Sequence, residues 1–290
     1  MRLIRDHDSY ALGVAWPNLA SEAARLAQGA RRPADVYPTI STVLEYLDDP
    51  HGELVPPDER TTWTGRLHNM ASMPTGRLVG VAGVLELPGL GFPPRSGRAK
   101  AYVHAAWRVL RSVHPADGWI IDLREDYGGD AIPMLAAVEP FLDCSRFLGF
   151  RDAAQGTTWF HVREGSVGVR GPRGTSTTLG AYGTPPPPIP GRLALLAGAS
   201  TASSGEATLI ALRCHQGASF MGEPTAGLTG SPSTFTLSDG AWLRLTTSVA
   251  VDGAGTVYGG TVEPDIPVEW GSSVTDDPVL DRAVRFLASF

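Results

Sequence analysis

The sequence predicts an α/β fold, and three observations lead to that class. Apolar residues make up 42% of the 290 residues and charged residues 19%, which is the composition of a globular chain. Short apolar runs at 119–123 and 193–197 have the length and composition of buried strands. Each run passes through a turn of small residues into a helical pattern, at 131–142 and 203–215. Repeated strand–turn–helix units are typical of layered α/β proteins.

The other elements follow from apolar spacing and from residues that break helices. Helical patterns lie at 16–27, 36–47, 99–113 and 276–288. Strand patterns lie at 76–88, within 157–182, at 219–222 and in the stretch that continues to about 268. We therefore expect a small helical N-terminal segment over 1–60 and an α/β core over 61–290 that ends in a β-rich tail.

Charge and hydropathy exclude several classes of partner. The net charge is -6 and no basic run occurs, which argues against nucleic acid. No stretch approaches 18 consecutive apolar residues, so no membrane-spanning helix is expected. The first residues contain no apolar signal-peptide core. If Met1 is the natural start we expect a cytoplasmic protein, and if the chain was trimmed, an extracytoplasmic one. The sequence specifies no oligomeric state.

The two cysteines, Cys144 and Cys214, are too few for a disulfide framework, and we expect both to be small buried residues. No Cys/His pair has zinc spacing and no His-Glu-x-x-His occurs. The sequence therefore implies neither a metal nor a cofactor.

The first candidate for chemistry is the segment 199–206, where a predicted strand passes into a helix. Backbone N–H groups at a helix start are unpaired and favour negative charge. A serine there can be a nucleophile whose oxyanion those groups bind. The alternative is structural, because Ser203 and Glu206 have the spacing of a capping box.

The second candidate is the turn after the strand at 119–123. Gly128 and Gly129 allow positive φ and a close backbone approach, so their N–H groups can face an oxyanion. An ordinary strand-to-helix turn would have the same residues.

A general base completes the set. Lys100 is the only lysine and lies in a polar segment without signs of burial, whereas His51 lies in a loop. A solvated histidine would fit that loop equally well. An α/β hydrolase with Ser200 as nucleophile is disfavoured, since only His215 follows it, on the helix that the nucleophile itself would begin.

Together these segments resemble the C-terminal processing (tail-specific) peptidase family, which includes the tricorn core and the interphotoreceptor retinoid-binding repeats. The resemblance covers roughly residues 10–270. Five motifs match in order: Leu47-Asp-Asp-Pro-His-Gly, Ile120-Ile-Asp-Leu-Arg-Glu-Asp-Tyr-Gly-Gly (Asp126 replacing Asn), Leu195-Leu-Ala-Gly-Ala-Ser-Thr-Ala-Ser-Ser-Gly-Glu-Ala, Gly222-Glu-Pro-Thr-Ala-Gly and Val262-Glu-Pro-Asp-Ile-Pro-Val.

The resemblance implies a crotonase/ClpP-like core and a serine hydrolase. Ser203 would be the nucleophile and His51 the base, with the oxyanion bound by backbone N–H groups of Ser204 and of Gly128 or Gly129. Leu228 occupies the position of the family's lysine, so the chain resembles the lysine-free branch. About 25 residues separate His51 from the next strand, too few for the family's PDZ domain.

Two departures from that branch leave the acid that orients His51 open. Tyr258 stands where the branch has a glutamate, and Pro50 where a serine is common. The acids considered in its place are Asp48, Asp49, Glu206 and Glu223, and Glu206 and Tyr258 are kept as accessory site residues.

The leading hypothesis is hydrolysis of a peptide or amide bond through an acyl-enzyme. A protein that binds apolar ligands on the same fold, with little or no catalysis, is the second hypothesis. A specialised acyl-transfer or small-molecule tailoring enzyme is the third. The expected partner is a peptide or a small amide or acyl substrate.

Overall fold

The computed structural model describes the chain except residues 12–13, 64–71, 92–94, 116, 272–276 and 290. The described residues form two compact units. The first contains the predicted N-terminal segment and adds distant pieces of chain: Met1–Arg66, Phe150–Gly156 and Gly230–Val249. The second consists of Leu67–Gly149, Thr157–Thr229 and Ala250–Phe290.

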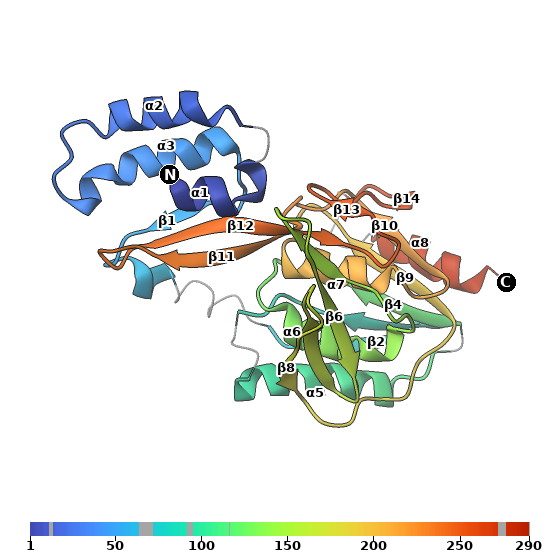
Figure 1. Cartoon of the computed structure of the whole chain (residues 1–290). Coiled ribbons are helices and arrows are strands. Elements are labelled where there is room, and N and C mark those ends of the chain that lie inside the picture. The colour runs from blue at the N-terminus through green and yellow to red at the C-terminus, as the bar shows by residue number, and fades with distance from the viewer. Residues whose placement is uncertain (12–13, 64–71, 92–94, 116, 272–276, 290) are drawn as a thin grey trace. The chain divides into compact units, whose positions relative to one another are not determined.

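In the first unit, helices cover an antiparallel hairpin (Figure 1). The helices are α1 (Arg2–His7), α2 (Trp16–Leu26) and α3 (Tyr37–Leu47), with short 3₁₀ turns at Ser9–Ala11 and Pro33–Val36. The hairpin joins β11 (Gly230–Thr236) to β12 (Trp242–Val251), and β1 (Glu53–Val55) pairs with the other edge of β12. Ile4, Val43 and Leu47 pack on Leu243 and Leu245 of β12, which forms the core of this unit.

The second unit is built on a six-stranded sheet in the order β14-β10-β9-β4-β3-β2. Only the β2–β3 pair is antiparallel. The strands are β2 (Thr75–Val79), β3 (Ala82–Glu86), β4 (Gly118–Asp122), β9 (Arg192–Ala197), β10 (Ala218–Gly222) and β14 (Ile266–Pro267). The carboxyl ends of β4 and β9 lie side by side, since Asp122 pairs with Leu196. The turns that follow these two strands are therefore neighbours.

Both faces of this sheet are buried. On one face, Val84, Ile120 and Leu196 pack against helix α8 (Pro278–Ala288). Side chains of the opposite parity are buried on the other face, where Trp119 meets Phe141 edge to face. Further helices are α5 (Gly97–Ser112), α6 (Ala131–Ala137) and α7 (Ser204–Leu212). A buried, mainly parallel sheet confirms the predicted α/β class.

Most predicted elements are confirmed, with small shifts at their ends. The helix predicted over 131–142 ends at Ala137 and continues as a 3₁₀ turn, Glu139–Phe141, because Pro140 cannot donate to the helix. The predicted final helix begins at Pro278, and residue 276 lies outside the described residues. Further strands are β5 (Gly149–Asp152), β6 (Thr157–Arg163), β7 (Ser166–Arg170), β8 (Ser176–Ala181) and β13 (Val257–Tyr258). Among the described helices, none has both the length and the apolarity to cross a bilayer.

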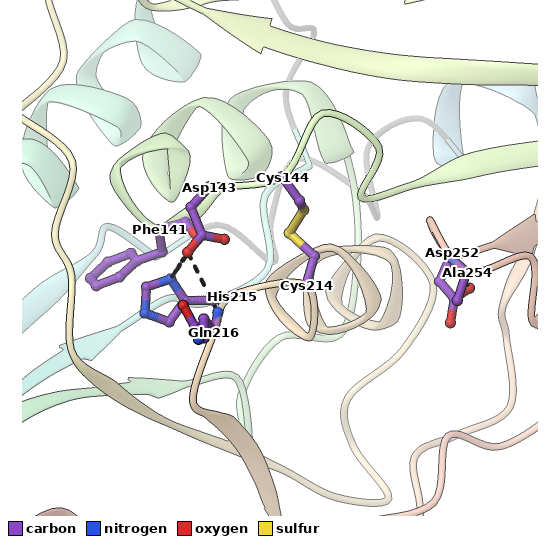
Figure 2. The surroundings of a disulfide bond; sticks show 8 residues. All are labelled: Phe141, Asp143, Cys144, Cys214, His215, Gln216, Asp252 and Ala254. Carbon is purple, nitrogen blue, oxygen red and sulfur yellow. Dashed lines mark hydrogen bonds and ion pairs between the residues drawn. A yellow bond between two sulfur atoms is a disulfide. The ribbon is translucent and has the colours of Figure 1, made fainter.

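The prediction that Cys144 and Cys214 are small buried residues is wrong, since both are only partly buried. Cys144 and Cys214 form a disulfide (Figure 2). Their Cα–Cα distance is 6.2 Å. Cys144 lies after the 3₁₀ turn that follows α6, and Cys214 lies shortly after α7. The bond therefore connects the chain near the C-terminal ends of these two helices. The two cysteines are 70 residues apart, and nothing in the sequence indicated that their sulfurs lie close together. Beside the bond, Asp143 lies 3.4 Å from Nδ1 of His215 (Figure 2).

Candidate active site

Ser203 occupies a strained turn between β9 and α7. Its φ is 53° and its ψ −111°, a conformation that non-glycine residues seldom adopt. The buried Thr201 fixes the turn, because its hydroxyl donates to the Leu123 carbonyl (2.9 Å) and accepts from the Gly198 N–H (3.1 Å). The half-buried Ser203 is thus presented at the start of a helix.

The Glu206 carboxylate stabilises this turn through a hydrogen bond. Its Oε2 accepts the Ser203 N–H at 2.8 Å, the glutamate half of the predicted capping box. Its Oε1 accepts the Thr225 hydroxyl at 2.5 Å and the Gly227 N–H at 2.8 Å. Burial raises the pKa of this carboxyl, and the bonds from Thr225, Gly227 and Ser203 oppose that shift. Glu206 therefore supports the serine turn and joins it to the Gly222–Gly227 motif.

The glycine turn after β4 lies directly against the serine turn. The Ala202 N–H donates to the Asp126 carbonyl at 2.9 Å. A Cβ added to Gly128, whose φ is 97°, would lie 2.9 Å from the Ser203 Cβ and 3.4 Å from the Ser204 nitrogen. At Gly129 an added Cβ would meet the Leu90 carbonyl oxygen at 1.9 Å. Both positions therefore require glycine, because their φ is positive and a side chain would clash with neighbouring atoms.

Two of the three predicted oxyanion donors are free. Within the described residues, neither the Gly129 N–H nor the Ser204 N–H donates a hydrogen bond. The Gly128 N–H instead donates to Oδ1 of Asp126 at 3.0 Å. Of the two glycines left open by the sequence, Gly129 is therefore the one with an available donor.

His51 lies in the first unit, in a network with a carboxylate and a hydroxyl. Asp49, 7% exposed, accepts the His51 backbone N–H at 3.0 Å. It also accepts the backbone N–H of Thr246 at 2.9 Å and the Thr246 hydroxyl at 2.5 Å. The same hydroxyl lies 3.4 Å from Nδ1 of His51. Thr246 thus lies between the imidazole and the carboxylate.

This network fits a neutral imidazole that is protonated on Nδ1. The Thr246 hydroxyl donates its proton to Asp49, so it can only accept from His51. Nε2 is buried and has no partner among the described residues. Burial lowers the pKa of His51 below its ordinary 6.5, the charge of Asp49 opposes the shift, and Arg244 adds to it. His51 is therefore neutral at pH 7, as a base must be.

The other predicted acids have different surroundings. Asp48 is exposed at the end of α3, with a left-handed φ of 52°. Glu223 accepts the Trp270 N–H at 3.1 Å, and the Tyr258 hydroxyl donates to Asp252 at 3.0 Å. No hydrogen bond between described residues links Tyr258 to the serine turn, so its accessory role stays a prediction. Asp49 is the candidate acid that bonds to His51.

The structure thus groups the predicted residues into two sets, one in each unit. Ser203, Ser204, Glu206 and both glycines form the first set, and His51 with Asp49 forms the second. Sequence reasoning missed Thr246, which is a fully buried hydroxyl in the middle of β12. Its neighbours Leu245 and Thr247 gave no hint that this threonine meets an aspartate.

Among the described residues, one group of three side chains could ligate a metal: Asp143, Cys144 and Cys214. The two sulfurs of that group are joined in the disulfide. It therefore offers no thiolate pair to a metal ion.

Comparison with known proteins shows a family and similar folds. The model of peptidase family S41 matches residues 82–268, which include both turns of the serine set but not His51. A lipoprotein from Streptococcus agalactiae has a similar structure, with a TM-score of 0.73, 19% identity, and coverage of 99% of this chain and 93% of that one. The photosystem II D1 C-terminal processing protease follows with a TM-score of 0.62, 15% identity, and coverage of 92% and 91%.

A curated relative is similar in sequence. The nisin-resistance protein of Lactococcus lactis subsp. lactis is 28% identical over 151 residues, which are 52% of this chain and 46% of that protein. The match thus spans about half the length of that relative.

Proposed function

The chain belongs to peptidase family S41, and on this basis we propose that it is a serine peptidase with Ser203 as nucleophile and His51 as general base. The observation that carries the proposal is the serine turn. Ser203 has a positive φ at the start of a helix, it packs on Gly128, and free N–H groups of Gly129 and Ser204 lie in the same two turns.

In the proposed reaction, the Ser203 hydroxyl oxygen attacks the carbonyl carbon of a peptide bond while Nε2 of His51 takes the hydroxyl proton. The tetrahedral oxyanion accepts hydrogen bonds from the N–H groups of Gly129 and Ser204. As the C–N bond breaks, His51 returns the proton to the leaving amine. Water then attacks the acyl-enzyme, with His51 again as base, and releases Ser203.

Asp49 and Thr246 are proposed to orient the base. An imidazole that donates from Nδ1 keeps the lone pair of Nε2 available for the serine proton. When His51 becomes an imidazolium, the negative charge of Asp49 stabilises it through the Thr246 hydroxyl. This hydroxyl relay takes the role for which the sequence offered no glutamate, since that position holds Tyr258.

The proposed substrate class is a peptide. The family is a family of peptidases, and the similar D1 protein is named a C-terminal processing protease. That likeness supports a peptide over a small amide, and it supports no particular sequence.

A fluorophosphonate probe tests the proposal, because it phosphonylates activated serines without need of a known substrate. Labelling of the full chain should be lost in Ser203→Ala and should persist in Ser200→Ala, the neighbouring serine that a nucleophile elbow would use. His51→Gln should slow labelling by about 100-fold or more. If the folded wild type is not labelled, the peptidase proposal fails and binding of an apolar ligand becomes the favoured function.

A further inference from the structure

A buried carboxyl group that the proposed mechanism does not use lies under the two turns of the serine set. Asp126 is 0% exposed. Its Oδ1 accepts the Gly128 N–H at 3.0 Å, and its Oδ2 is buried without a hydrogen-bond partner among the described residues. The main chain of Asp126 accepts from Ala202 and donates to Leu123, both at 2.9 Å. One residue thus connects the glycine turn to the serine turn.

The side chain also lies against the first turn of α7. A Cβ added to Gly205 would come within 2.8 Å of the Asp126 carboxyl carbon and 2.6 Å of its carbonyl oxygen. Gly205 is two residues beyond Ser203, so the carboxyl group is packed beneath the nucleophile turn. Because the interior is closely packed, a change in the charge or shape of this carboxyl group would displace both turns.

The described residues place no cationic side chain in an ion pair with the Asp126 carboxyl group, whether arginine, lysine or histidine. The titratable group that faces it is Tyr102 of α5, whose phenol donates to the Pro88 carbonyl at 2.7 Å, and α7 presents Gly205. An isolated ionised carboxylate in such surroundings is strongly unfavourable, so the group keeps its proton instead. Burial accordingly raises the pKa of Asp126 well above its ordinary value.

We propose that Asp126 is a positioning residue of the active site, and that it holds the Gly128–Gly129 turn against the serine turn as a neutral carboxylic acid. Oδ1 of its carboxyl group accepts the Gly128 N–H. The Gly129 N–H, which has no acceptor among the described residues, is available to the oxyanion. The positioning role rests on the proposed peptidase function, whereas the neutral state of the carboxyl group does not.

Three variants of the full chain test the proposal. Asp126→Asn keeps a neutral acceptor, Asp126→Leu removes it, and Asp130→Asn changes a neighbouring acid that bonds to Ile132 instead of Gly128. Infrared difference spectra at pH 8 should show the C=O band of one protonated carboxyl group lost in Asp126→Asn and kept in Asp130→Asn. The rate of fluorophosphonate labelling should fall at least 10-fold in Asp126→Leu and stay within about 3-fold of wild type in Asp126→Asn.

The pH profile separates a neutral acid from a merely structural residue. Wild-type labelling should decline at alkaline pH as Asp126 ionises, and Asp126→Asn should not share that decline. The proposal is overturned if the infrared band is absent, or if Asp126→Asn loses as much labelling as Asp126→Leu while circular dichroism shows both folded. A wild type that shows the band but no labelling would refute the peptidase function and the positioning role, and would confirm the neutral acid alone.

Discussion

At the scale of single residues, Thr246 lies between the imidazole of His51 and the carboxylate of Asp49. In a Ser-His-Asp triad the carboxylate instead bonds to the imidazole directly. The Thr246 hydroxyl bonds to Asp49 at 2.5 Å and lies 3.4 Å from the imidazole. The Thr246 hydroxyl thus connects the imidazole to the carboxylate, and the imidazole itself makes no direct hydrogen bond to Asp49.

Thr246→Val should therefore reduce kcat with little change in KM. We expect a loss between about 10-fold and the roughly 10⁴-fold loss that follows removal of the orienting carboxylate in a serine protease. Thr246→Ser keeps the hydroxyl and serves as the matched control, which should recover most of the activity. Peptidase kinetics on a substrate identified for the wild type would measure this. Equal activity of the Val and Ser variants would contradict the relay.

The protonation of His51 sets the acid side of the pH profile. Since burial lowers its pKa below 6.5, the neutral base is already the main form at pH 6.5. The rate of fluorophosphonate labelling should rise with pH through an apparent pKa below 6.5. An acid limb centred above 6.5 would indicate that another group titrates, or that Asp49 dominates over burial.

At the scale of elements, the turns after β4 and β9 pack against each other. They are neighbours because adjacent parallel strands end at the same edge of the sheet. Gly128 is a point of close approach between the turns. Its α-carbon leaves no space for a side chain beside Ser203.

Gly128→Ala should separate the turns and lower fluorophosphonate labelling by about 10-fold or more. The added methyl group would lie 2.9 Å from both the Ala202 carbonyl and the Ser203 Cβ. Gly174→Ala is the control, since Gly174 also has positive φ (80°) but nothing within 4 Å of the added atom. Both variants should lose about 1–2 kcal/mol from backbone strain, and only Gly128→Ala should lose labelling. Similar labelling in the two would refute the close-approach account.

At the scale of the whole molecule, the disulfide stabilises the unit that carries Ser203. It closes a loop with a sequence separation of 70 between the ends of α6 and α7. Disulfides persist in oxidising compartments. We therefore propose that the protein works outside the reducing cytoplasm, the second of the two locations that the sequence allowed.

Reduction, or the double change Cys144→Ala and Cys214→Ala, should lower the free energy of unfolding by about 4 kcal/mol for a loop of this length. Urea titrations with and without reductant would measure the difference. The double variant should not respond to reductant. An unchanged midpoint for the reduced wild type would contradict the stabilising role of the bond.

The sequence predicted the fold class, because strand–turn–helix units leave a periodic signal in adjacent residues. It also indicated Ser203, Gly128, Gly129 and Ser204, since turn chemistry is local. It could not identify Thr246 or the Cys144–Cys214 bond, because each depends on pairing between segments that are distant in sequence. Of the four acids that the sequence left open, Asp49 is the one that bonds to the His51 backbone and to Thr246, and its orienting role is a proposal.

The central claim is that Ser203 and His51 act as a catalytic pair, and a crystal structure of the fluorophosphonate adduct tests it most directly. We predict phosphorus on Oγ of Ser203, Nε2 of His51 within about 3 Å of that oxygen, and a phosphonyl oxygen that accepts from the N–H groups of Gly129 and Ser204. Phosphorus on a different residue, or a side chain other than His51 in contact with Ser203 Oγ, would contradict the claim.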